Sequence, residues 1–409
     1  MTARRLVGDE DTIRISAVIM HHPSRGARLP ALLARLAELN PRVIPDPKPS
    51  GPPSPLRTAK LAWAAIAPGA THHLVLQDDI TPAPDIGRQL HRAVTANPDC
   101  GISLYVNWNS PQNSYLVRRA AVTGSPWAPL SPLEYTPTLG LVLPVAHAAA
   151  LAAHLAALPD VLKDDDEVVT PFRIRRGLPA VASVPHLLEH GDERSTAGND
   201  SHGRRRATVY APGLDLDTTH WTAHLPTSGA GIGTVAVTRA GAATTPGMPD
   251  YAVEFVESTC QLRLVQPLAR EPIEHGFGWY WYDWCALIGV ERDRIVETWR
   301  TEPAADEHHS RLGLEFWAAC YLLGADAWAT RSHRDASLTA HGELARRALE
   351  SWVRAGLAAR DRRALSEGEQ ADLVDLGARA LWRGWLDRAA AGTKWPAVRH
   401  VGRSESAHV

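Results

Sequence analysis

The sequence lacks the features of several common protein classes. Its 409 residues include only four cysteines, Cys100, Cys260, Cys285 and Cys320, and no Cys-x-x-Cys pair. That scatter argues against a disulfide framework or a zinc knuckle and predicts reduced thiols in the cytoplasm. The N-terminus has no apolar core of a signal peptide. Basic and acidic side chains nearly balance, 43 against 45, so we expect no nucleic-acid partner and no attachment to a membrane surface.

Long hydrophobic runs are also absent. The one candidate, residues 139–159, contains no Asp, Glu, Lys or Arg, but Pro144 divides it into a short strand and an Ala-rich helix. A membrane-spanning helix needs about 20 continuous apolar residues, so we expect two buried elements here and no membrane span. The chain is too long for one compact core, which predicts two domains.

The first half of the chain alternates between strand and helix patterns. Strand-like runs occur at residues 13–20, 42–45, 74–76, 101–106, 139–143 and 180–184. Helical patterns occur at residues 29–39, 56–66 and 84–96. Strands that alternate with helices through short connections predict an α/β domain with a mostly parallel sheet flanked by helices, and we assign residues 1–210 to it.

Two adjacent carboxylates follow one of these strands. The apolar run Leu74–Leu76 leads through Gln77 into Asp78 and Asp79. The carboxyl ends of strands in open α/β sheets are where ligands bind. Two acidic side chains held this close repel each other unless a positive charge lies between them, and a hydrated divalent metal is the usual solution.

A second acidic run, residues 164–167, comes before a helical pattern and the strand at residues 180–184. Taken alone, these carboxylates are typical of a solvated helix N-terminus, where they interact favourably with the helix dipole. The segment that follows the strand adds His186, Glu189 and His190. The sequence therefore places a second set of potential acid, base and metal-ligating groups about 110 residues after the first.

In their order along the chain, these segments resemble a bacterial GT-A-type glycosyltransferase over residues 13–210. The resemblance does not extend to the second half. It implies a GT-A-like fold and transfer of a sugar from a nucleotide-sugar donor to an acceptor hydroxyl, dependent on Mn²⁺ or Mg²⁺. Asp79, with Asp78 beside it at the donor, resembles the Asp-x-Asp element that holds the metal, and His190 resembles the histidine that completes its ligands. Gln77 departs from the strict Asp-x-Asp spacing.

The resemblance also implies roles for other residues. Asp165 or Asp166 resembles the carboxylate that activates the acceptor hydroxyl as a general base in an inverting displacement. Because the usual Glu-Asp pair is here a run of four acidic residues, both positions are retained. Arg57 and Lys60, one helical turn apart, and Arg25 in the first loop are assigned to the donor phosphates or base.

The acceptor is expected to bind the polar, aromatic and proline-rich stretch at residues 107–138, where we predict a long loop. Trp108 and Trp127 could stack on a sugar ring while Asn109 hydrogen-bonds its hydroxyls. The alternative is a surface excursion with Trp127 packed in the core.

Two other functions compete with transfer. One is a catalytically inactive GT-A-like scaffold that binds a nucleotide sugar or a protein partner. The absence of the strict Asp-x-Asp spacing is the argument for this alternative. The other is a zinc protease, because His186-x-x-Glu189-His190 matches an inverted zinc motif. That motif requires a helix, and Pro185 before it and Gly191 after it leave little room for one.

The second half differs in composition. Residues 211–250, rich in Thr, Gly, Pro and Ala, predict a linker or hairpin, and residues 251–398 predict a mainly helical domain. Ten of the fourteen tryptophans fall after residue 275, which favours a packed core. The alternative is a sugar-binding surface formed by Trp279, Trp281 and Trp284. Residues 399–409 predict a flexible polar tail.

Overall fold

The computed structural model describes residues 12–132, 134–159, 162, 164–191, 204–223, 251–264, 279–285, 290–303, 311–329 and 342–391. The chain forms two compact units. Unit 1 comprises Met1–Asn107 and Glu134–Ala223, and unit 2 comprises Trp108–Leu133 and His224–Val409. In the described part of the chain, no helix is both long and apolar enough to cross a membrane.

This division differs from the expected one in two places. Unit 1 continues past residue 210 to Ala223, and the chain leaves it for unit 2 over Trp108–Leu133. The predicted loop at residues 107–138 contains helix α4 (Asn113–Val122), all ten residues of which are buried. The polar, proline-rich residues on both sides of this helix are typical of a loop, so the whole stretch has the composition of a loop although its central ten residues are helical. Most of the predicted linker, residues 224–250, and the tail lie outside the described residues.

Six strands of unit 1 lie in one sheet in the order β2-β1-β3-β7-β5-β8. They are β1 (Ile15–His21), β2 (Arg42–Pro45), β3 (His72–Gln77), β5 (Gly101–Ser103), β7 (Gly140–Pro144) and β8 (Ala180–Ser183). β7 runs antiparallel to β3 and β5, while the pairs β1–β2, β1–β3 and β5–β8 are parallel. The prediction of an α/β fold with a mostly parallel sheet is therefore confirmed.

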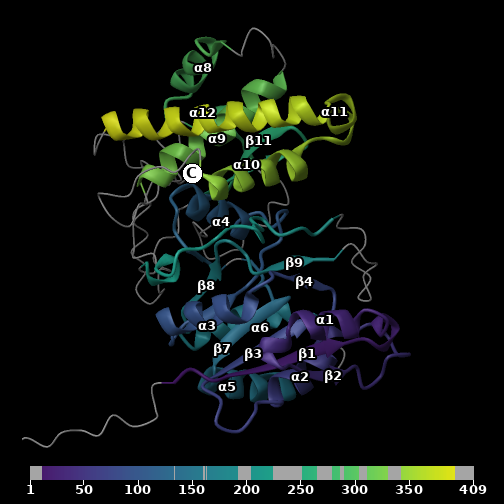
Figure 1. Cartoon of the computed structure of the whole chain (residues 1–409). Coiled ribbons are helices and arrows are strands. Elements are labelled where there is room, and N and C mark those ends of the chain that lie inside the picture. The colour runs from purple at the N-terminus through teal and green to yellow at the C-terminus, as the bar shows by residue number, and fades with distance from the viewer. Residues whose placement is uncertain are drawn as a thin grey trace, which may run out of the picture. The chain divides into compact units, whose positions relative to one another are not determined.

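The predicted helices of unit 1 form close to their expected bounds. They are α1 (Leu29–Arg35), α2 (Pro55–Ala64), α3 (Ile86–Ala96), α5 (Val145–Ala156) and α6 (Asp166–Arg175) (Figure 1). The helix expected at residues 29–39 ends early and continues as the 3-10 turn η3 (Ala37–Leu39), which Asn40 closes in a left-handed conformation. A second 3-10 turn, η2 (Pro23–Arg25), follows β1.

An apolar core fixes the sheet against three of these helices. Val18, Val75 and Leu141 from neighbouring strands pack with Trp63 of α2 and Phe172 of α6. Side chains alternate between the two faces of a strand, so the intervening buried residues face the other side. Because both faces are buried, the strands read as continuous apolar runs. The ends of the strands are thereby held at fixed positions, and these ends carry the polar residues.

Unit 2 is built around one buried helix, α9 (Arg311–Ala329). Besides α4, the other described helices of unit 2 are α7 (Trp281–Trp284), α8 (Arg292–Arg300), α10 (Glu343–Gly356), α11 (Ala359–Ala364) and α12 (Glu367–Ala391). The apolar spacing of the sequence predicts helices over residues 311–323, 338–357 and 367–391, and α9, α10 and α12 form there. The antiparallel sheet of β10 (Tyr251–Val256), β11 (Thr259–Leu264) and β12 (Trp279–Tyr280) was not predicted, although residues 251–264 are rich in β-branched and aromatic residues.

α9 and α12 approach so closely that glycine is required at two positions. A Cβ atom on Gly324 would collide with the carbonyl oxygen of Leu381, and one on Gly384 would collide with that of Tyr321. Each glycine thus admits the backbone of the other helix, in the manner of small-residue helix packing. The contact joins the two longest helices of unit 2.

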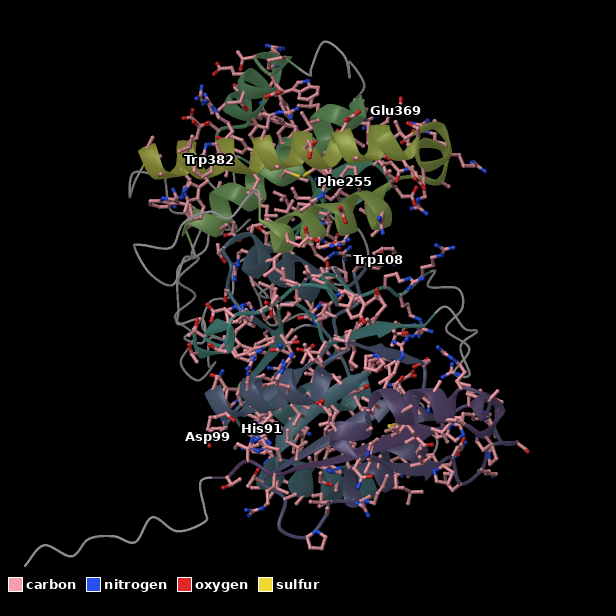
Figure 2. The ribbon with its side chains drawn as sticks, viewed as in Figure 1. His91, Asp99, Trp108, Phe255, Glu369 and Trp382 are labelled. Carbon is pink, nitrogen blue, oxygen red and sulfur yellow. The ribbon has the colours of Figure 1, made fainter. Side chains whose placement is uncertain are left out.

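Most of the tryptophans described in unit 2 pack inside it. Trp281, Trp317 and Trp352 are buried, whereas Trp382 on α12 is 44% exposed (Figure 2). Trp299 and Trp385 are buried as well, so the interpretation as core is confirmed for these five residues. Burial also excludes Trp281 as an exposed sugar platform. The side chains of Trp279 and Trp284 lie outside the described residues.

Candidate functional site

The polar residues of unit 1 converge because of the strand order. β1, β2 and β3 are parallel and adjacent, and their registers pair His21 with Pro45 and Met20 with Gln77. The three strands therefore end at the same edge of the sheet. β7 runs the opposite way, with Gly140 opposite Leu76, so this edge also receives the residues that precede β7. Ligands of open α/β sheets bind at such an edge.

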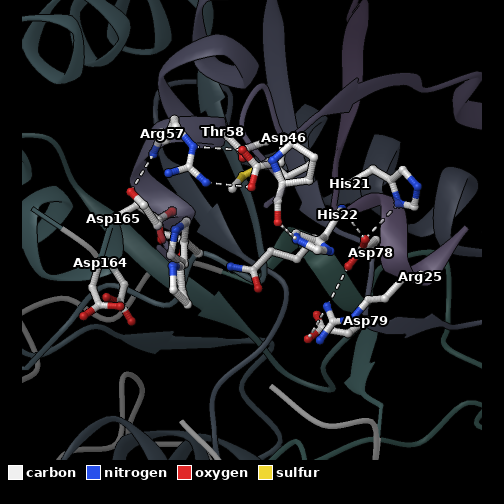
Figure 3. Close-up of a pocket in the computed structure, with 18 of the residues that line it drawn as sticks. His21, His22, Arg25, Asp46, Arg57, Thr58, Asp78, Asp79, Asp164 and Asp165 are labelled. Atoms are coloured by element: carbon white, nitrogen blue, oxygen red, sulfur yellow. Dashed lines mark hydrogen bonds and ion pairs between the residues drawn. The ribbon is translucent and has the colours of Figure 1, made fainter. Parts of the chain in front are cut away.

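A pocket of about 380 Å³ opens at this edge (Figure 3). Its charged lining consists of Asp46, Asp78, Asp79, Asp164, Asp165, Asp166, Arg25, Arg57 and Arg205. Six carboxylates against three guanidinium groups make the pocket acidic. It therefore favours cationic ligands, or anionic ligands that arrive with a cation.

Asp78 is held by donors on three sides. Its Oδ2 accepts hydrogen bonds from His21 Nδ1 at 2.9 Å and from the backbone N–H of His22 at 2.8 Å. Its Oδ1 lies 2.7 Å from Nη1 of Arg25. Both oxygens are occupied, so Asp78 is a rigid member of the pocket wall.

Asp79 is less completely satisfied. Its Oδ2 lies 3.0 Å from Arg25 Nη1 and 3.5 Å from Nε2 of His190, while its buried Oδ1 has no hydrogen-bond partner among the described residues. Burial lowers the pKa of Arg25, but the charges of Asp79 and Asp78 outweigh that effect and the pKa is raised above its ordinary value. Arg25 is therefore a permanent cation between the two carboxylates, as Figure 3 shows.

His190 is brought to Asp79 by a short antiparallel ladder. β4 (Ile80–Pro82) pairs with β9 (Leu188–His190), and Ile80 lies opposite His190. Nδ1 of His190 donates to the carbonyl oxygen of Gly191 at 2.5 Å. Burial lowers the pKa of the His190 imidazole, so the ring is neutral and its Nε2 carries a lone pair directed to the Asp79 side. The structure thus brings together the two predicted metal ligands.

The second acidic pair lies at the start of α6. Asp165 is buried, and its Oδ2 has no hydrogen-bond partner in the described part of the chain. Burial raises its pKa to about 6, although a hydrogen bond from Thr138 opposes the shift. Burial, followed by repulsion from Asp165, raises the pKa of Asp166 to about 7. These carboxylates also sit at a helix N-terminus, so the capping interpretation and the acid–base interpretation both describe them.

The two basic residues of α2 have different environments. Arg57 lines the pocket and forms a bidentate ion pair with Asp46, with N–O distances of 2.9 and 2.8 Å. Lys60 is not among the residues that line the pocket, and its Nζ donates to the carbonyl oxygen of Leu158 at 2.7 Å. Of the predicted donor-binding residues, the pocket therefore contains Arg25, Arg57 and Asp78.

The predicted acceptor residues belong to unit 2. Trp108 is partly exposed and Asn109 is exposed, while Trp127 is fully buried at 0% exposure. Burial leaves Trp127 no free ring face for a sugar, in agreement with the alternative that it is a core residue. None of the three lines the pocket of unit 1.

The zinc-protease motif does not have the geometry that its chemistry needs. Residues 188–190 form strand β9, and His186 is buried in a non-helical segment. Glu189 accepts hydrogen bonds from the backbone N–H groups of His190 and Ala207. Among the described residues, no group of three or more His, Cys, Asp or Glu is placed to hold a metal ion by itself.

Several pocket residues were not predicted from the sequence. His21 and Asp46 lie at the ends of β1 and β2, and Thr138 comes just before β7. In the sequence, each of these is a polar residue next to a strand that shares an edge with β3. Their place in the pocket follows only when the order of the strands in the sheet is known.

A scan against protein-family models and a search of curated proteins find no match to this chain. Function is therefore inferred from the residues and geometry of the pocket.

Proposed function

We propose that unit 1 transfers a sugar from a nucleotide-sugar donor to an acceptor hydroxyl with the help of a divalent metal. The observation that carries the proposal is that two acidic pairs, Asp78–Asp79 and Asp165–Asp166, line the same pocket although more than 80 residues separate them. One pair is poised to hold a cation, and the other retains protons near neutral pH. Transfer from a diphosphate donor needs both functions.

The Asp165–Asp166 pair suits the base in this reaction. A general base works best when its pKa lies near the operating pH, and burial moves both carboxylates into that range. In the proposed displacement, the acceptor oxygen forms a bond to the anomeric carbon as the bond from that carbon to the diphosphate breaks. The hydroxyl proton passes to a carboxylate of the pair. The unpartnered Oδ2 of Asp165 is the better-placed acceptor for that proton.

The residues around Asp79 fit a divalent metal that takes few of its ligands from protein. Asp79 Oδ1 and His190 Nε2 both carry lone pairs without a proton donor among the described residues. Mg²⁺ is commonly bound through one or two carboxylates, with water and substrate phosphates completing its shell, and an imidazole ligand suits Mn²⁺. When bound, such a metal stabilises negative charge on the leaving diphosphate as a Lewis acid.

The proposal is tested by nucleotide release. The full chain is incubated with UDP-, GDP- and TDP-sugars, each with Mn²⁺ or with EDTA, and the free nucleoside diphosphate is measured, with water as the default acceptor. Mn²⁺-dependent release from one donor is the expected result. A nucleotide that raises the melting temperature but is never released from its sugar would instead favour the inactive scaffold, which the bridging of both carboxylates by Arg25 also allows.

A further inference from the structure

A single nitrogen, Nη1 of Arg25, lies between the carboxylates of Asp78 and Asp79. It is 2.7 Å from Asp78 Oδ1 and 3.0 Å from Asp79 Oδ2. The Arg25 side chain is 10% exposed and the two aspartate side chains are 6% and 7% exposed, so water and salt screen the contact weakly. The guanidinium group thus supplies the positive charge that two neighbouring carboxylates require.

The acidic pair keeps its position without Arg25. Asp78 Oδ2 accepts hydrogen bonds from the ring of His21 and from the backbone N–H of the residue that follows it. The backbone of Asp79 is fixed separately, because the N–H of Gly191 donates to its carbonyl oxygen at 2.7 Å. Removal of the guanidinium group would therefore leave both carboxylates near their present places.

A second observation at the same place points to a cation other than Arg25. Asp79 is 5% exposed, and its Oδ1 has no hydrogen-bond partner in the described part of the chain. His190 Nε2 lies 3.5 Å from the other oxygen of the same carboxylate. Arg25 contacts Oδ2 but does not satisfy Oδ1, so the arginine alone leaves a buried charge partly unpaired.

We infer that Arg25 and a divalent metal compete for Asp78 and Asp79, so that Arg25 is the counter-ion of the pair until a metal displaces it. The inference rests on the proposed function, from which the metal is expected. Arg25 ends the turn η2, and Pro23, Ser24 and Gly26 around it are exposed, so its side chain can leave without disturbing the core.

Displacement would also give Arg25 a second partner. A guanidinium group released from two carboxylates in this pocket is available to a diphosphate, which it binds with bidentate geometry. Metal and diphosphate would then bind cooperatively, because each favours the state in which Arg25 has left the acidic pair. Mn²⁺ alone should bind the wild-type chain weakly, since it must first break the contacts of Arg25.

The test is a titration of the full chain with Mn²⁺ alone, in which free Mn²⁺ is followed by electron paramagnetic resonance. Arg25→Gln should bind Mn²⁺ at least about tenfold more tightly than the wild type, because the competing charge is gone. Arg25→Lys, which keeps the charge and so guards against loss of the fold, should give an intermediate affinity. Melting temperatures of all variants establish that they are folded.

The matched control is Arg205→Gln. Arg205 lines the same pocket, and its charge acts on His190, yet no ion pair joins it to Asp78 or Asp79 among the described contacts. It should change Mn²⁺ affinity by no more than about threefold, as expected for a charge that acts at longer range. Equal gains in Arg25→Gln and Arg205→Gln would overturn the inference, because charge alone would then explain the effect.

Unchanged or absent Mn²⁺ binding in a folded Arg25→Gln would also overturn it. Failure of the proposed function would be recognised by a different result. In that case the wild type releases no nucleotide from any donor sugar, whatever Arg25→Gln does to Mn²⁺ affinity.

Discussion

The two acidic pairs of the pocket solve the same electrostatic problem in different ways. Asp78 and Asp79 lie beside a permanent cation, Arg25, which contacts both. Asp165 and Asp166 have no such ion pair among the described contacts, and burial raises the pKa of each. One pair is balanced by an arginine and the other by retained protons, although both lie in one pocket.

A pair of neighbouring aspartates therefore does not by itself define a metal site. What decides its chemistry is the nearest cation and the degree of burial. A pair that already has a cation can exchange it for another cation. A pair that holds protons can give up and take up protons near neutral pH, which is the property of a general base.

The largest expected effect comes from removing the proton-holding pair. Asp165→Asn together with Asp166→Asn should lower the rate of sugar transfer about 10³-fold, because a lost general base typically costs 10²- to 10⁴-fold. Nucleotide binding should be retained, since the other pair is intact. Transfer is measured by nucleotide release, and binding by thermal shift. Glu167→Gln, an exposed neighbour that does not line the pocket, should behave as wild type, and full activity in the double variant would contradict the assignment.

Removing the cation-holding residue should abolish binding instead of chemistry. A nucleoside diphosphate with Mn²⁺, at about 100 times its dissociation constant, should stabilise the wild type by about 2.7 kcal/mol. Asp79→Ala should lose this Mn²⁺-dependent stabilisation, while Asp99→Asn, an exposed aspartate outside the pocket, should keep it. The assignment of roles to the two pairs would be wrong if Asp79→Ala kept the Mn²⁺-dependent stabilisation and the Asp165–Asp166 double variant lost it.

A third buried carboxylate, Glu315 in unit 2, sharpens the comparison because neutral donors make its hydrogen bonds, although the exposed Arg311 also lies 3.7 Å away. Glu315 is 0% exposed and accepts hydrogen bonds from the backbone of Cys260 at 2.9 Å, from Tyr280 Oη at 2.8 Å and from Trp281 Nε1 at 3.1 Å. Glu315→Gln should reduce the free energy of unfolding by about 2 kcal/mol, since the amide NH₂ replaces an acceptor. Urea denaturation measures the loss. The exposed Glu343→Gln should cost under about 0.5 kcal/mol.

The pH dependence of stability compares the two pairs without any ligand. In the folded protein the pKa values of Asp165 and Asp166 lie at about 6 and about 7, above the ordinary 3.8. The folded chain therefore holds these protons where the unfolded chain has released them, so their contribution to stability is lost as pH rises towards 7. The slope is at most about 1.4 kcal/mol per pH unit for each proton. Urea midpoints between about pH 5 and 8 should fall in the wild type and stay flatter in the Asn double variant.

Much of unit 1 could be predicted from the sequence because its elements follow local rules. In unit 1, the apolar runs of the sequence form the strands of the sheet. In unit 2, the helix over residues 367–391 has the expected bounds for the same reason. α4 was missed because its helical pattern is embedded in polar, proline-rich flanks. The β10–β11 hairpin was missed because a helical pattern was extended over a segment with strong strand propensity.

The candidate site was predictable only in part. Asp78, Asp79 and Asp165 stand out because they are acidic residues beside strand or helix ends. The contact of Arg25 with Asp78 spans 53 residues of chain, so the local sequence pattern does not reveal Arg25 as the counter-ion of the Asp78–Asp79 pair. Lys60 shares a helix with Arg57, but its ammonium group is taken by a backbone carbonyl.

The close approach of α9 and α12 limits how the sequence of unit 2 can change. A methyl group added at Gly324 or Gly384 would collide with a backbone oxygen. A second substitution cannot relieve this collision, because it changes side chains and leaves the backbone in place. Compensation would require a shift of a whole helix through a packed core. We therefore expect a saturation screen to tolerate only glycine at these two positions, whereas the exposed position of Trp382, on the same helix as Gly384, should accept most residues.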